Sequence, residues 1–199
     1  MTTRVRVTIG VIAAAVAAEA LIVAPAGSSS SSNRRPQGPF AWLHPASPSA
    51  SWKVAHTSSG AALAYPPGWK PIEGDAGTAS VALLGGGDRF PDRISSFLNA
   101  TPKQGPETLA NWTHYRLQHN RGEDNTNVRL IASAKDLSFR AARGSCVIDD
   151  YTTSKATYRE IACIVTSSRS TGVVVAAAPR AFWDQRAPTL ERAVSSFTP

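Results

Sequence analysis

The sequence predicts an α+β domain: an antiparallel β-sheet of about six to eight strands, with a mid-chain helix and C-terminal helices packed on it. One observation is a series of short segments rich in apolar and β-branched residues, divided by turn residues such as 58–60 (Ser-Ser-Gly) and 66–68 (Pro-Pro-Gly). Another is an apolar stripe near the C-terminus, where Leu190, Val194 and Phe197 recur at helical spacing. Together these patterns favour helices that cover an antiparallel sheet.

The expected elements follow in chain order. Besides a hairpin that carries the two cysteines, the segments with the composition of strands are 52–57, 61–65, 78–84, 94–100, 128–133, 137–141 and 172–178. A helix is expected to begin at Pro106, with an acid in its first turn, and to end near Gly122. Prolines also precede two expected C-terminal helical stretches, at 180–187 and 189–197.

The chain contains two cysteines, and a hairpin that turns around Ser154 and Lys155 would place Cys146 directly opposite Cys163. Directly opposed residues lie within the distance that a disulfide tolerates, so this register predicts a Cys146–Cys163 bond. The alternative is a pair of buried free thiols. The same register pairs apolar with apolar and acid with base: Ile148 with Ile161, and Asp150 with Arg159.

On the other face of this hairpin, the register sets Asp149 opposite Glu160. Two opposed carboxylates can share a proton for acid-base chemistry or bind a hard cation, so both are weak candidates for a metal site. We expect instead an exposed face, where water and nearby cations screen the charges and no large pKa shift arises. No catalytic or metal site is therefore predicted, and no cofactor, because the glycines at 85–87 lack the Gly-Lys-Ser/Thr of a phosphate loop.

The N-terminus, residues 1–26, has the pattern of a signal peptide or a membrane anchor. Arg4 and Arg6 precede an apolar run at 7–24, whose only charge is Glu19. Eighteen residues are near the lower limit for a membrane span, and an acid in mid-segment costs about 2.5–3.5 kcal/mol on insertion scales. Cleaved signal and uncleaved anchor both remain open. Either one sends the rest of the chain across the membrane, into a compartment where disulfides form.

Residues 27–50 are expected to form a disordered tether, because serines, prolines and glycines prevent them from burying enough apolar surface to fold. Phe40 and Trp42 are the exceptions: they could dock on the domain or lie at the membrane surface. Residues 51–199 then make one globular domain. Its formal charge is about +4, since four of the 21 basic and one of the 14 acidic residues lie in the first 50. The domain has no Lys/Arg run, so no nucleic-acid partner is predicted.

The order of these elements resembles the PsbP/Mog1-like fold family over residues 52–197. The resemblance includes Tyr65-Pro66-Pro67-Gly68-Trp69 after the first hairpin and Ser195-Ser196-Phe197 at the closing helix. It implies a non-catalytic protein, because family members are usually extrinsic photosystem subunits, a nuclear-transport GTPase binder, or bacterial envelope proteins. There is no family catalytic motif to carry over.

With its leader, this chain is similar to the bacterial extracytoplasmic branch of that family. We therefore expect a non-catalytic envelope protein, secreted or membrane-anchored, whose domain binds a protein or an envelope component. The alternative from another class is a cation-dependent or hydrolytic enzyme that uses Asp149 and Glu160. A sheet face or cleft lined by apolar groups, without convergent titratable residues, would favour binding, whereas a deep pocket that holds both acids would favour the enzyme.

Overall fold

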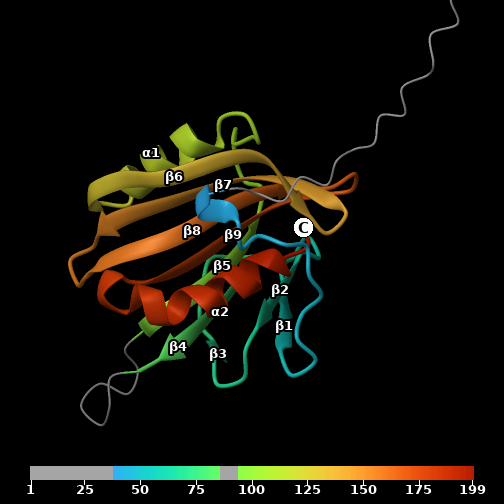
Figure 1. The fold of residues 1–199 in the computed structure, drawn as a ribbon, viewed down its shortest axis with the longest axis horizontal. Helices are drawn as coiled ribbons and strands as arrows, with labels where there is room; N and C mark the ends of the chain where they lie inside the picture. Colours follow the sequence, from blue (N-terminus) through green and yellow to red (C-terminus); the bar gives the residue numbers. More distant parts are fainter. Residues whose placement is uncertain (1–37, 86–93) are drawn as a thin grey trace, which may run out of the picture. The chain divides into compact units, whose positions relative to one another are not determined.

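A seven-stranded antiparallel sheet forms the centre of the domain (Figure 1). The computed structural model describes residues 38–85 and 94–199. Its strand order is β3-β4-β5-β9-β8-β7-β6, and β1 (Lys53–His56) pairs with β2 (Ala62–Tyr65) in a separate two-stranded sheet. The strands of the large sheet are β3 (Lys70–Pro71), β4 (Ala79–Leu84), β5 (Ile94–Pro102), β6 (Thr126–Phe139), β7 (Ala142–Thr152), β8 (Thr157–Thr166) and β9 (Thr171–Pro179). The predicted α+β class is confirmed.

One face of the large sheet is covered by α2 (Trp183–Ser195), which crosses in front of the strands in Figure 1. The short helices η1 (Gly38–Phe40) and η3 (Arg180–Phe182) lie on the same side. Leu190, Val194 and Phe197 are fully buried against the sheet, as their spacing predicts. This face carries the larger apolar core of the domain.

The predicted tether at 27–50 is too long at its C-terminal end. Phe40 and Leu43 are 2% and 1% exposed and belong to the main apolar core, and Trp42 packs against that core. Burial of a large apolar side chain contributes roughly 1.5–3 kcal/mol, which offsets the entropy of ordering a short segment. The rest of the expected tether, residues 27–37, and the leader 1–26 lie outside the described residues.

The opposite face of the sheet is partly covered by α1 (Trp112–Gly122). The helix begins six residues later than predicted. Asn111 explains the difference, because its side chain accepts the Thr108 N–H and donates to the Pro106 carbonyl, which closes a turn in place of a helical start. The indole of Trp112 is buried and donates to the Ala162 carbonyl at 2.9 Å, which fixes the helix on the sheet.

Two further predictions of element boundaries are wrong. The segments 128–133 and 137–141 were expected to be separate strands, but β6 runs from Thr126 to Phe139 as one strand with irregular register. The pairing of β6 with β7 shifts register between Ala134 and Leu137. Asp136 lies in this shift with a left-handed backbone, at φ 56°, so the strand continues where the sequence predicts a break. Likewise α2 is one helix with Pro188 inside it. The lost hydrogen bond lies near the helix N-terminus, and burial of the apolar stripe offsets it.

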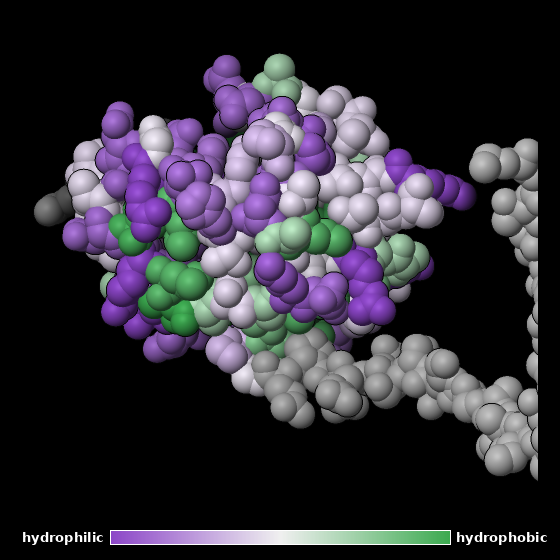
Figure 2. Space-filling model, turned by 90° about the horizontal axis from the view of Figure 1, so that it is seen from above, coloured by the Kyte–Doolittle hydropathy of each residue, from purple (hydrophilic) through white to green (hydrophobic). Residues whose placement is uncertain are grey.

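The surface seen from above, over α1 and β6, is mostly hydrophilic, with small hydrophobic patches between charged groups (Figure 2). Leu130 and Ile131 of β6 are among the exposed apolar side chains. Within the two described ranges, no helix is both long enough and apolar enough to cross a membrane.

Candidate functional site

The cysteine-containing hairpin has the predicted register. Cys146 pairs with Cys163, Ile148 with Ile161, and Asp150 with Arg159. The structure contains the Cys146–Cys163 disulfide, with 4.1 Å between the two Cα atoms. Both cysteines are fully buried in the core on the α2 face. The bond therefore ties β7 to β8 within the core, away from solvent.

Asp149 and Glu160 are also opposite each other, as predicted, but the expectation of an exposed face is wrong. Both side chains are 0% exposed. The reason is that α1 lies across this part of the sheet and covers both carboxylates. Where this helix docks on the sheet is set by long-range packing, which has no local sequence signal.

Two side chains of α1 bind the buried carboxylates. Arg116 donates from Nε to Oε1 of Glu160 at 2.6 Å and from Nη2 to Oε2 at 2.8 Å, which is a bidentate ion pair. Asn120 donates from Nδ2 to Oδ2 of Asp149 at 2.8 Å and to Oε1 of Glu160 at 3.1 Å. These residues were missed by sequence reasoning. The signal was available, because Trp112, Arg116 and Asn120 recur at intervals of four and so share one face of a helix.

This environment separates the pKa values of the two acids. Burial, together with the charge of Glu160, raises the pKa of Asp149 from 3.8 to about 8. Burial also acts to raise the pKa of Glu160, but the charge and hydrogen bonds of Arg116 hold that pKa below its usual value. At neutral pH the pair therefore carries about one negative charge, which the Arg116 guanidinium neutralises.

The arrangement fits a structural role better than a catalytic one. A hollow of about 660 Å³ beside α1 reaches Arg116 and Asn120, yet neither Asp149 nor Glu160 lines it. The oxygens of Glu160 are bound by Arg116, so a substrate or cation would have to displace the helix side chains to reach them. Within residues 38–85 and 94–199, no group of three or more His, Cys, Asp or Glu side chains is placed to hold a metal ion.

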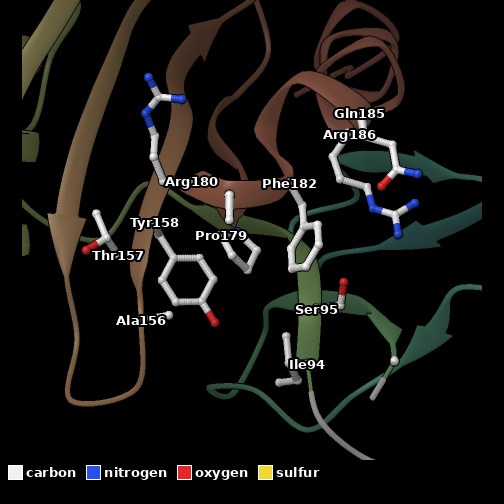
Figure 3. A pocket seen from close by; sticks show the side chains of 12 residues that line it. Ile94, Ser95, Ala156, Thr157, Tyr158, Pro179, Arg180, Phe182, Gln185 and Arg186 are labelled. Carbon is white, nitrogen blue, oxygen red and sulfur yellow. The ribbon is translucent and has the colours of Figure 1, made fainter. Parts of the chain in front are cut away.

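A second hollow, which we call the end cavity, lies where β5 and β8 begin and β9 ends, beside η3 and the first turns of α2. Its volume is about 670 Å³, within the range of sites for small ligands. Figure 3 shows the Tyr158 ring, Pro179 and the Phe182 ring side by side, with Ile94 below them. The residues that line it are Gly85, Ile94, Ser95, Ala156, Thr157, Tyr158, Pro179, Arg180, Ala181, Phe182, Gln185 and Arg186.

The end cavity was not predicted, because its residues come from four separate segments and form no sequence motif. Two of its apolar side chains are unusually accessible: Phe182 is 53% exposed and Ile94 is 38% exposed. No carboxylate of the described chain lines the cavity, whereas Arg180 and Arg186 do. The end cavity therefore combines apolar walls with positive charge at its border.

Comparison with solved structures places the fold in the PsbP/Mog1-like class. Cyanobacterial PsbP from Synechocystis sp. PCC 6803 aligns with a TM-score of 0.54 at 14% identity, over 75% of this chain and 93% of that one. LpqN of Mycobacterium tuberculosis, which is involved in cell envelope biogenesis, aligns with a TM-score of 0.42 at 13% identity, over 74% and 91%. No family model matches the sequence, and no curated protein is similar to it. The predicted fold family is confirmed at the level of fold.

Proposed function

We propose that this chain is a non-catalytic, extracytoplasmic binding protein whose end cavity takes an envelope component or a segment of a partner protein. The observation that carries the proposal is the cavity itself, with a volume of about 670 Å³, apolar walls and an arginine border. Exposed large apolar side chains that line one concavity are typical of ligand sites.

Two features support a position outside the cytoplasm. The apolar run at 7–24, preceded by arginines, has the pattern of a leader. The Cys146–Cys163 disulfide suits an oxidising compartment. A reporter that is active only in the cytoplasm, fused after Pro199, is expected to stay silent in intact cells. Strong reporter activity would contradict this location for the domain.

The rival function, a cation-dependent or hydrolytic enzyme that uses Asp149 and Glu160, has two observations in its favour. The pKa of Asp149 is raised to about 8, and a perturbed carboxyl is common in active sites. Its Oδ1 is buried without a hydrogen-bond partner in the described part of the chain. Full burial of both acids still argues against this function, because a catalytic group must contact its substrate.

Thermal unfolding with and without divalent cations separates the two functions. We expect the midpoint of the parent protein to be the same in both conditions, because Arg116 already neutralises the pair. A midpoint raised by the cation in the parent, and not in the Asp149→Asn variant, would support the enzyme and contradict the binding proposal.

Site-specific photocrosslinking in intact cells tests the binding proposal directly. A benzophenone amino acid at Phe182 places the crosslinker at the end cavity. The matched control is Leu130, an apolar side chain of β6 that is 41% exposed and does not line the cavity. We expect a discrete adduct from position 182 and none from position 130. Equal labelling at both positions, or none at 182, would refute the end cavity as the binding site.

A further inference from the structure

The walls of the end cavity are suited to an apolar chain. Ile94 lies opposite Phe182 and Pro179, and the Tyr158 ring closes one side (Figure 3). Ile94 and Phe182 are both substantially exposed to water. A chain placed between them would remove apolar surface of both from water, which favours binding.

The charge at the border of the cavity comes from Arg186 of α2. Its side chain extends toward Ser95 on β5, beside the apolar walls (Figure 3). The Nε of Arg186 is buried and has no hydrogen-bond partner among residues 38–85 and 94–199. A buried guanidinium donor without an acceptor is costly, so an anionic acceptor at this place would be bound favourably.

Arg180 increases the positive charge around the cavity. It points away from Phe182 and lies 3.7 Å from Asp150. That one carboxylate already accepts hydrogen bonds from Arg159 at 2.7 Å and from Arg129 at 3.2 Å. Three guanidinium groups thus share a single carboxylate, which leaves a local excess of positive charge near the cavity.

We propose that the end cavity binds one molecule of a single-chain amphiphile, with its acidic headgroup on Arg186 and its apolar chain between Ile94 and Phe182. This inference rests on the proposed function and specifies its ligand class. A guanidinium binds carboxylate and phosphate groups through paired hydrogen bonds, so either headgroup would fit. The ligand is taken as a monomer and not as part of a bilayer surface, because the apolar groups line a concavity.

Calorimetric titration of the full chain with three twelve-carbon probes tests the ligand class: dodecanoate, dodecanol and dodecyltrimethylammonium, each below its micelle concentration. We expect dodecanoate to bind most tightly and the cation least. Arg186→Gln should weaken dodecanoate binding about tenfold or more and leave dodecanol unchanged, because only the charged headgroup contacts the guanidinium. Arg121→Gln, an exposed arginine of α1 outside the cavity, is the matched control and should change neither.

A second variant keeps the test informative if Arg186→Gln folds poorly. Phe182→Ser alters an exposed side chain and should weaken dodecanoate and dodecanol by similar factors. Equal affinities for dodecanoate and dodecanol, unaffected by Arg186→Gln, would overturn the acidic ligand but leave the binding function intact. Binding to phosphatidylglycerol vesicles without binding of monomeric dodecanoate would contradict the proposal that the ligand is bound as a single molecule. Absence of binding to all probes, with an adduct still formed at position 182, would overturn only this inference; absence of both would overturn the proposed function as well.

Discussion

Asp149 and Asp150 are neighbours in β7, yet the two faces of the sheet give them opposite properties. Asp149 points under α1, where burial and Glu160 raise its pKa to about 8. Asp150 points to the α2 side and keeps 9% of its side chain exposed. Burial also acts to raise the pKa of Asp150, but hydrogen bonds from Arg159 and Arg129 lower it overall. The comparison shows that the arginines bound to a carboxylate, and not its burial alone, decide whether it stays charged.

The largest expected effect is at Glu160. Glu160→Gln leaves the buried Arg116 guanidinium without its counter-charge, and loss of one partner of a buried ion pair costs about 3–5 kcal/mol. Asp150→Asn is the matched change on the other face, where Arg129 and Arg180 are solvated and the cost should be smaller, about 1.5–3 kcal/mol. Urea unfolding of both variants measures the difference. Equal losses would mean that the two faces do not differ as described.

The next effect is a pH dependence that comes from Asp149. Its pKa is about 8 in the folded protein and 3.8 when unperturbed, so the folded state binds the extra proton between these values. Stability should therefore fall as the pH rises from about 4 to about 8. Asp149→Asn should remove this decline and be more stable than the parent at pH 9 by at least about 1 kcal/mol, the scale of one pKa unit.

Glu160 acts in the opposite direction in the same titration. Its folded pKa lies below its usual value, so its contribution is present above pH 4.5 and is lost as the pH falls. The Asp149→Asn variant should still lose stability as the pH falls below about 4.5, because Glu160 is unchanged. The measurement is the free energy of unfolding from pH 3 to pH 9 for parent and variant. A parent curve that stays flat up to pH 9 would be inconsistent with a proton held on Asp149.

The disulfide between β7 and β8 is expected to contribute less to stability than the buried ion pair of Glu160. Its closed loop would contribute at most about 3 kcal/mol, and less here because the hairpin already holds the cysteines together. Cys146→Ala with Cys163→Ala should lower the unfolding free energy by less than Glu160→Gln does. Mass spectrometry of non-reduced, alkylated protein from the envelope fraction gives the oxidation state. Two alkylated cysteines would show that the bond is absent there.

The register of the cysteine hairpin could be predicted from the sequence, but the burial of its other face under α1 could not. Three side-chain pairs point to one register, so local chemistry was sufficient to place Asp149 opposite Glu160. Whether those acids are exposed depends on where α1 packs, which is a long-range contact with no local signature. The end cavity was invisible for the same reason, because Ile94, Tyr158 and Arg186 are far apart in the chain. The end of the tether was misplaced because composition alone does not show which of the two possibilities left open for Phe40 and Trp42, docking on the domain or lying at the membrane surface, applies.

The central claim is that ligand contact occurs at the end cavity and not at the buried carboxylates. Amide chemical shifts of the isotopically labelled domain, recorded during titration with dodecanoate, test it most directly. The account predicts that saturable shift changes concentrate at Ile94, Tyr158, Phe182 and Arg186, with Arg116 and Asn120 unchanged. Shift changes concentrated around Arg116, Asn120 and Glu160, with the end cavity unaffected, would contradict it.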